Sequence, residues 1–327
     1  MTSFSSTKHS VFTPLFFAFA AAALLVGCGD SSSSGTAPDA ATDAAVDGAN
    51  DDAATIDAST EDAATADADS GPQPKPYSLF AHFDGSLYSV NATTGALTEI
   101  GATGQTYIVL EWDDEAGVMR VIADPYSDNG GPATPKLGTI DLCSGPVTKG
   151  TALVEDTTDV RRAEGLAKDP ESGTWWITYG TVGNTTPTQY ISNRIGTVNI
   201  ETGAVTYKAA VDTLQDDGDI LEFEGSTLFA LDIATVNNQG NLYEVNQTTG
   251  AQTVGASTGP SVLRIAYHPV EQVMYAATGT PSYQNRGIGT LNTTTGVVTP
   301  IGSYISNAEH PSQQFTSLAF ARAPDCN

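Results

Sequence analysis

The stretch LYEVNQTTGAQTVG at 242–255 decides the fold, because close copies of it recur along the chain. An Asn or Asp that is followed four residues later by Gly, after an alternating strand pattern, occurs five times. The pairs are Asn91 and Gly95, Asp141 and Gly145, Asn199 and Gly203, Asn246 and Gly250, and Asn292 and Gly296. Asn and Asp side chains accept hydrogen bonds from the backbone two residues further on, and Gly tolerates the positive φ at which such a turn ends. The pattern therefore predicts five hairpin turns between strands.

Each turn is flanked by two more strand-like runs, such as LRIAYH at 263–268 and VMYAATG at 273–279. Four strands in a unit of about 50 residues are typical of a β-propeller blade. No part of 76–327 shows a sustained helical periodicity, which argues against a helical solenoid. The spelling LYxVNxxTGxxTxIG resembles the repeats of quinoprotein-like and YVTN-type propellers, and this resemblance implies a fold but no particular activity.

The two ends of the repeat region complement each other. SLFAHF at 78–83 opens a first unit that lacks an innermost strand, and FTSLAFA at 315–321 matches VLRIAYH at 262–268. We therefore expect the C-terminal strand to complete the first blade. The predicted fold is all-β: a five-bladed β-propeller of four-stranded antiparallel blades. The longest repeat, 160–212, is where a misread strand would change the count to four or six.

The N-terminal residues 1–28 are expected to be an export signal. Lys8 precedes the apolar run VFTPLFFAFAAAALLVG, whose last residues with Cys28 (LVGC) resemble the bacterial lipobox. The resemblance implies that Cys28 is acylated, with palmitate among the acyl chains. It also implies that the protein is anchored by these lipids in the bacterial cell envelope. Gly29, where Asp would signal inner-membrane retention, favours the outer membrane. An ordinary signal peptide or an N-terminal anchor is the alternative.

Residues 29–75 are predicted to be a disordered tether ahead of the propeller domain at 76–327. The segment is rich in Ala and Asp, has no aromatic residue, and carries eleven carboxylates against Lys75. Such a composition buries too little apolar surface to offset chain entropy, and its charges repel one another. Much of the formal net charge of −25 therefore belongs to a spacer.

Two cysteines remain in the propeller domain. Cys143 lies in the turn between the third and fourth strands of the second blade, and Cys326 follows the closing strand of the first. Both positions fall on one face in neighbouring blades, and disulfides persist in exported proteins. We therefore predict a Cys143–Cys326 disulfide, with two free thiols as the alternative.

Long polar loops join the second and third strands of the blades, and we name the face that carries them the loop face. Binding residues concentrate on such loops. Three of the loops carry a Tyr and end in a cation, and the predicted ligand-binding residues are Tyr126, Lys136, Tyr190, Arg194, Tyr283 and Arg286. The competing interpretation is that these cations pair with the many acidic residues of the same face.

The sequence predicts a binding or interaction module whose loop face holds a glycan, a peptide or an envelope protein. It has no serine-hydrolase, zinc-protease or phosphate-loop motif, and we expect a monomer without a metal ion or cofactor. The net charge disfavours nucleic acid. One alternative is a glycan-active hydrolase that uses the inner-strand carboxylates Glu111, Glu164 and Glu222. Another is a structural envelope lipoprotein without a soluble ligand.

Overall fold

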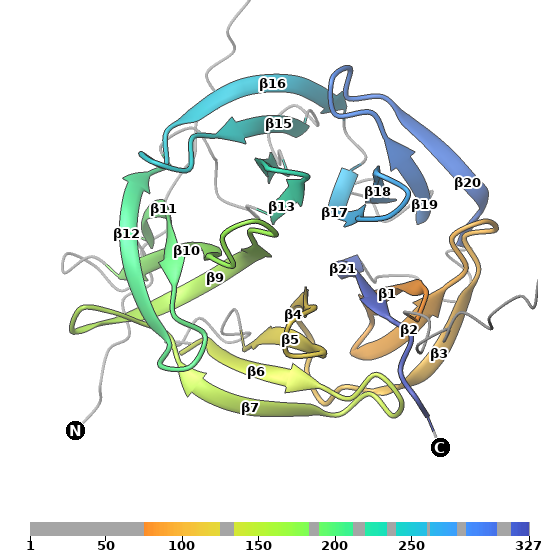
Figure 1. Cartoon of the computed structure of the whole chain (residues 1–327), viewed down its shortest axis with the longest axis horizontal. Helices are drawn as coiled ribbons and strands as arrows, with labels where there is room; N and C mark the ends of the chain where they lie inside the picture. The colour runs from red at the N-terminus through yellow and green to blue at the C-terminus, as the bar shows by residue number, and fades with distance from the viewer. Residues whose placement is uncertain are drawn as a thin grey trace, which may run out of the picture. The chain divides into compact units, whose positions relative to one another are not determined.

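The computed structural model describes residues 75–124, 134–182, 190–211, 220–233, 240–259, 262–279, 286–305 and 315–326. All regular elements in these ranges are strands, and Asp69–Asn327 forms one compact unit. The strands form sheets that stand in a ring, with one strand of each sheet at the centre (Figure 1). This is a propeller-like, all-β arrangement. The described ranges contain no helix with the length and apolar character needed to cross a membrane.

Four of the sheets have four antiparallel strands each, ordered from the centre of the ring outwards. The first contains β21 (Phe315–Arg322), β1 (Tyr77–Phe83), β2 (Ser86–Val90) and β3 (Leu97–Ala102). The second contains β4 (Ile108–Asp113), β5 (Val118–Ala123), β6 (Lys136–Ile140) and β7 (Val147–Ala152). The fourth contains β13 (Ile220–Glu224), β14 (Thr227–Asp232), β15 (Gly240–Val245) and β16 (Gln252–Gly259). The fifth contains β17 (Val262–His268), β18 (Val273–Thr278), β19 (Arg286–Leu291) and β20 (Val298–Ile305).

The third sheet along the chain corrects the prediction of uniform four-stranded antiparallel blades. It is a closed barrel of five strands: β8 (Val154–Glu155), β9 (Thr158–Lys168), β10 (Trp175–Val182), β11 (Tyr190–Val198) and β12 (Ala204–Ala210). Strand β9 is long enough for its first residues to pair with β8, which in turn pairs in parallel with β12. The described residues therefore form four four-stranded sheets and one barrel, where the sequence predicted five four-stranded antiparallel blades.

The turns predicted from the recurring Asn or Asp are present in all five copies. In the fourth, the Asn246 Oδ1 atom accepts hydrogen bonds from the N–H groups of Thr248 and Thr249, both at 3.0 Å. Asn91, Asp141, Asn199 and Asn292 accept equivalent backbone bonds. The five glycines that end the turns all have positive φ, between 70° and 96°.

The same glycines explain why the copies of the turn are so similar in sequence. A Cβ atom on Gly296 would lie 2.1 Å from the carbonyl oxygen of Ser257, in the outer strand of the preceding sheet. Gly95, Gly145 and Gly203 meet the backbone of the outer strand before them at 2.2–2.6 Å, and Gly250 meets side chains there. Each turn therefore both reverses the chain and packs its sheet against the preceding one, around the whole ring.

The apolar core is divided among the interfaces between sheets. Five clusters of buried residues each join two neighbouring sheets, and one of them packs Phe83 and Leu318 of the first sheet with Ala266 and Tyr275 of the fifth. Strands β1 and β21 pair along their length, from Tyr77 opposite Arg322 to Phe83 opposite Phe315. The prediction that the C-terminal strand closes the ring is confirmed.

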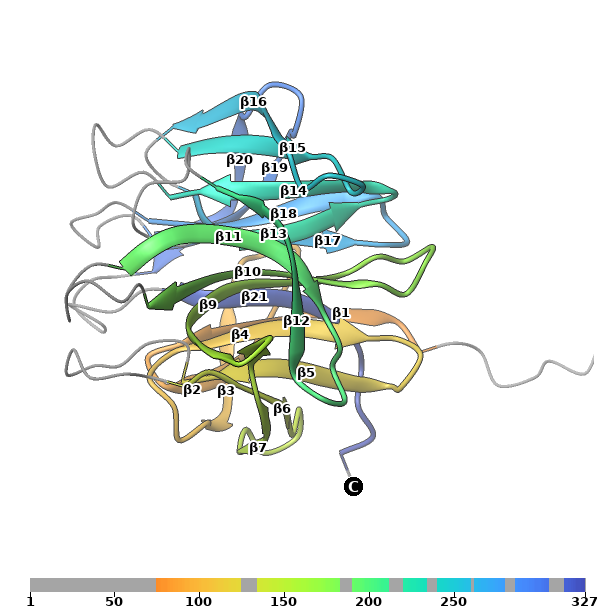
Figure 2. The ribbon, with the colours of Figure 1, turned by 90° about the vertical axis from the view of Figure 1, so that its left-hand side faces the viewer.

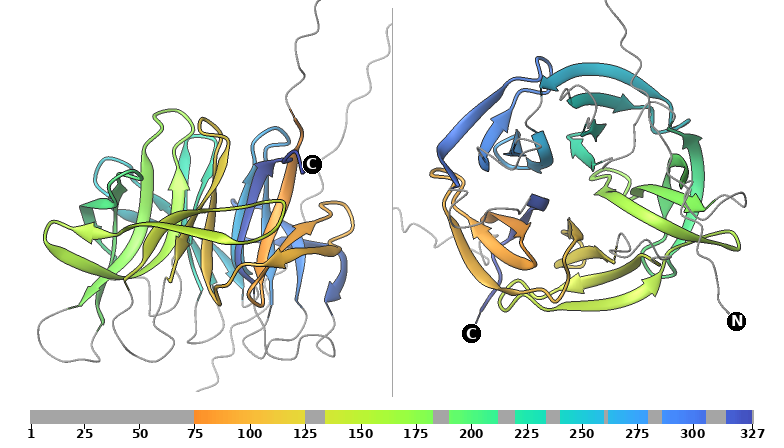
Figure 3. Two further views of the ribbon diagram at one scale, coloured as in Figure 1. Left: turned by 90° about the horizontal axis from the view of Figure 1, so that it is seen from below. Right: turned by 180° about the vertical axis from the view of Figure 1, so that it is seen from behind.

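A disulfide joins Cys143 to Cys326, as the sequence predicted, with their Cα atoms 5.3 Å apart. Cys143 lies in the β6–β7 turn and Cys326 follows β21, and the hairpin turns project from the face opposite the loop face (Figures 2 and 3). We name it the turn face; it carries the β4–β5, β9–β10, β13–β14 and β17–β18 connections and the five Asn or Asp turns. Lys75, the first described residue, is bound there through an ion pair with Asp325.

Candidate functional site

The residues predicted to bind a ligand on the loop face are only partly described. Tyr126 and Tyr283, like Cys28, lie outside the described residues, and the side chain of Tyr190 does too. Lys136 begins β6 and is half-buried.

The Arg194 guanidinium is held by partners within its own sheet. Its Nη1 atom donates to both carboxylate oxygens of Glu155, at 2.8 and 2.7 Å, and the guanidinium lies 5.4 Å from the centre of the Tyr207 ring. Nearby, Arg161 pairs with Asp159 at 3.1 Å. This geometry favours the competing interpretation, in which these cations neutralise neighbouring acids.

Arg286 does not project from the loop face as a free cation would. Only 1% of it is exposed, and its guanidinium lies 5.7 Å from the centre of the Phe83 ring, between the fifth and first sheets. A side chain in this position packs the ring interface and could reach a soluble ligand only if the loop face opened.

A cavity of about 570 Å³ opens instead on the turn face, at the centre of the ring. Its walls come from inner strands β4, β9, β13, β17 and β21 and from the turns that follow them. Its volume lies in the range of about 300–1,000 Å³ that is usual for small-molecule sites. The turn face is therefore hollowed where inner strands from all the sheets converge.

Aromatic side chains line this cavity at equivalent places on the inner strands. Trp112, Phe223, Tyr267 and Phe320 each pair across the ladder with a buried Met or Leu of the second strand. In the barrel the corresponding place, opposite Trp175, is taken by Lys168. The repeat thus gives the cavity four aromatic walls and one cation, to which Tyr77 of β1 adds a further ring.

Two carboxyl groups, Glu111 and Glu222, lie one residue before these aromatic positions and also line the cavity. Glu222 is 9% exposed. Burial raises the pKa of Glu111 to about 8, although the Lys168 N–H donates to its Oε1 atom at 3.3 Å. Burial and the neighbouring charge of Glu111 raise the pKa of Glu222 well above its usual range. The two carboxyls are therefore close enough to oppose each other's ionisation.

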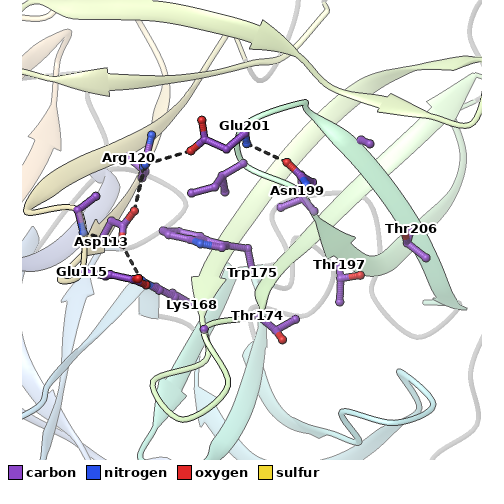
Figure 4. Close-up of a pocket in the computed structure, with 15 residues that line it drawn as sticks. Asp113, Glu115, Arg120, Lys168, Thr174, Trp175, Thr197, Asn199, Glu201 and Thr206 are labelled. Carbon is purple, nitrogen blue, oxygen red and sulfur yellow. Dashed lines mark hydrogen bonds and ion pairs between the residues drawn. The ribbon is translucent and has the colours of Figure 1, made fainter.

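The nearest cation, Lys168, is committed to other acids. Its Nζ atom lies 2.6 Å from Asp113 Oδ1 and 3.5 Å from Glu115, and Arg120 binds the second oxygen of Asp113 at 3.1 Å. Figure 4 shows this chain of ion pairs in an adjoining groove of about 750 Å³, beside Trp175. Burial alone would raise the pKa of Asp113, but the bonds from Lys168 and Arg120 lower it. Both cations of the groove are thus paired with its acids.

Glu164, the third predicted carboxylate, is separated from the cavity. It is 5% exposed, is paired with Arg162, and lines a narrow part of the central channel together with Glu222 and Arg264. The structure therefore brings Glu111 and Glu222 together at the mouth on the turn face and places Glu164 deeper in the ring. Among the described residues, no three His, Cys, Asp or Glu side chains are grouped to hold a metal ion.

The aromatic walls were missed by inspection of the sequence, although the repeat contains a signal for them. Trp112, Phe223, Tyr267 and Phe320 look like ordinary core residues when each strand is considered alone. Aligning the inner strands places them at one level, with Glu111 and Glu222 one position earlier. The sequence prediction considered the long polar loops and did not compare the inner strands with one another.

Comparisons with known proteins do not place the chain in a family. No family model and no curated protein matches the chain. A chain of a nidogen–laminin complex is 10% identical with a TM-score of 0.46, over 75% of this chain and 98% of that one. TolB from Acinetobacter baumannii is 10% identical with a TM-score of 0.42, over 70% and 53%. An exo-β-1,3-galactanase from Phanerochaete chrysosporium is 14% identical with a TM-score of 0.45, over 70% and 59%.

Proposed function

We propose that the protein is an extracytoplasmic binding module that holds a small molecule, or the end of a larger one, in the central cavity of the turn face. The observation that carries the proposal is the cavity itself, a hollow of about 570 Å³ with aromatic walls and two buried carboxyls. Small-molecule sites combine mostly apolar walls with a few placed polar groups. We propose the turn face in place of the loop face because Arg194 is paired with Glu155 and Arg286 is buried against the Phe83 ring.

Loss of binding in a wall variant tests this location. The protein is screened against small amines, amino acids, glycans and peptides, and each hit is repeated with Tyr267→Ala and with Arg194→Ala. We expect Tyr267→Ala to weaken the hit by roughly tenfold, because an aromatic contact contributes on the order of 1 kcal/mol. Arg194→Ala should leave it unchanged. The reverse pattern would return the site to the loop face, and no hit from any class would remove the proposal.

The lipid anchor is a separate part of the proposal and rests on the sequence alone. The run that ends in Val26, Gly27 and Cys28 supports acylation at Cys28 and attachment to the outer membrane. Metabolic labelling with radioactive palmitate, followed by membrane fractionation, tests it. The wild-type protein should be labelled and sediment with the outer membrane, and Cys28→Ser should do neither. Equal labelling of the two proteins would contradict the anchor.

A glycan-active hydrolase is the second candidate, and the two neighbouring buried carboxyls Glu111 and Glu222 in the cavity favour it. Glycosidases use a pair of carboxyl groups that flank the bond to be cleaved. Single replacements separate the two functions. In a hydrolase, Glu222→Gln would abolish turnover of a glycan while leaving its binding largely intact. A binding module would not hydrolyse any glycan that it binds, so Glu222→Gln would have no turnover to abolish.

A further inference from the structure

We propose that the ligand of the central cavity is a small organic cation, with an ammonium group between Glu111 and Glu222 and an apolar body against the aromatic walls. This rests on the proposed function of the cavity as a binding site and adds the class of ligand. Three observations support this ligand class: the charged residues that line the cavity, the ion pairs that some of them already form, and the aromatic side chains around them.

The charges that line the cavity are unbalanced. Its carboxylates are Glu111, Asp114, Glu115, Glu171 and Glu222, and its cation is Lys168. Arg322 neutralises Asp114 from the rim, at 2.6 Å, and Lys168 is held by Asp113 and Glu115. Within the described part of the chain, neither Glu111 nor Glu222 forms an ion pair. Lys168 lies near Glu111 and lowers its pKa, but its ammonium group is bound to Asp113 and Glu115, so a ligand could supply the missing ion pair.

Removing carboxylates from water without a counter-charge is costly, and proteins offset that cost by pairing or by protonation. The buried Glu111 and Glu222 hold protons far above the usual pH range of a carboxyl. A cationic ligand offers the pairing that the protein itself does not provide. An anionic ligand would oppose the ionisation of these carboxyls further, and a neutral ligand would leave them protonated.

The aromatic walls suit the same class of ligand. The faces of Trp, Tyr and Phe rings attract ammonium groups, and several such rings around one cavity are typical of sites for organic cations. Trp112, Phe223, Tyr267, Phe320 and Tyr77 all line the cavity. The Trp112 ring is fixed there by a hydrogen bond from its Nε1 atom to Asp114, at 3.1 Å. Rings and carboxyls together select a positively charged group with an apolar body.

Binding should displace protons from the two glutamates, and other groups facing them set the pH at which this occurs. These groups are Asp113, Asp114 and Glu115 on β4 and its turn, Lys168, Glu171 and Glu164 on β9 and its turn, Tyr267 and Arg264 on β17, and Tyr77 on β1. Asp113 and Lys168 neutralise each other, so the glutamates remain the groups whose ionisation a cation would change most.

Calorimetric titration with benzylammonium and with its neutral counterpart, benzyl alcohol, tests the inference on the whole protein. The two probes share shape and aromatic surface and differ in charge. We expect benzylammonium to bind roughly tenfold or more tightly than benzyl alcohol, because a buried charge-assisted bond is stronger than a neutral one. Titrations in two buffers with different heats of ionisation should show proton release at pH 7.

Variants identify the residues responsible. Glu222→Gln keeps the shape of the side chain but cannot ionise. It should reduce the affinity for benzylammonium roughly tenfold and leave the affinity for benzyl alcohol unchanged. The matched control is Glu244→Gln, since Glu244 is exposed on the third strand of the same sheet. Tyr267→Ala should weaken both probes.

The outcomes separate the ligand class from the site. Equal affinity for the two probes, with both weakened by Tyr267→Ala, would overturn the cation and retain the cavity. Failure of both probes, together with a glycan or peptide hit lost in Tyr267→Ala, would do the same. Failure of every compound would overturn the cavity and the cation together.

Discussion

Glu111 and Glu222 should make the stability of the protein depend on pH in an unusual direction. Their pKa values are raised in the folded state, Glu111 to about 8, so the folded protein keeps protons that the unfolded chain releases above about pH 4.5. Stability from this source is fully present below the unfolded pKa and is lost as pH rises through the folded pKa.

We therefore expect the melting temperature to fall between about pH 5 and pH 8, and the Glu111→Gln/Glu222→Gln variant to show a shallower fall. Scanning calorimetry across that range measures both. Because an acidic protein also loses stability through general charge repulsion at higher pH, Glu244→Gln serves as the control and should keep the wild-type slope. An unchanged slope in the double variant would show that these carboxyls ionise normally.

Gly296 tests the second role of the recurring turn, which is contact between sheets. Any L-residue at its φ of +73° costs about 1–2 kcal/mol, and a Cβ would also meet the Ser257 oxygen at 2.1 Å. Gly104 has nearly the same φ, +71°, but open space around its Cβ position. Gly296→Ala should therefore lower the free energy of unfolding by about 2–4 kcal/mol, and Gly104→Ala by about 1–2 kcal/mol. Equal losses in urea denaturation would mean that only the backbone conformation matters.

Strand β21 completes a sheet whose other strands, β1 to β3, come from the other end of the domain, so its attachment depends on contacts that are distant in sequence. The Cys143–Cys326 disulfide ties the chain just after β21 to the β6–β7 turn, across a sequence separation of 183 residues. Reduction should lower the free energy of unfolding by about 3–5 kcal/mol, because a cross-link over a long loop restricts the unfolded chain.

Urea denaturation with and without reductant measures this loss. A Cys143→Ser/Cys326→Ser variant should have the same free energy of unfolding in both conditions. In that variant, amide exchange should quicken first in β21 and β1. Equal stability of the wild-type protein with and without reductant would show that the strand pairing alone holds the ring closed.

Most of the strand architecture could be predicted from the sequence because it is encoded locally. Asn246 and Gly250 specify a turn through their own backbone bonds, and alternating side chains specify the strands beside it. The barrel was missed because β8 is only two residues long, and its pairing with β12 joins segments about 50 residues apart. No local pattern marks a two-residue strand whose partner is chosen by the packing of the ring.

For the ring of sheets as a unit, the surroundings of the candidate site residues were harder to predict than the fold. Arg194 and Arg286 stand out in the sequence as cations in polar loops, but the structure shows Glu155 beside the first and the Phe83 ring beside the second. The cavity brings together Glu111 of β4 and Glu222 of β13, and no pattern in the sequence indicates that these two residues are neighbours. Only ring closure brings the ends of the inner strands to one point.

The most direct test of the central cavity is a crystal structure of the protein soaked with benzylammonium and a small fragment library. We predict electron density on the turn face, with a ligand nitrogen within hydrogen-bonding distance of Glu111 or Glu222 and its apolar part against Tyr267. Density that clusters beside Arg194 on the loop face, with the central cavity left to water, would contradict the account.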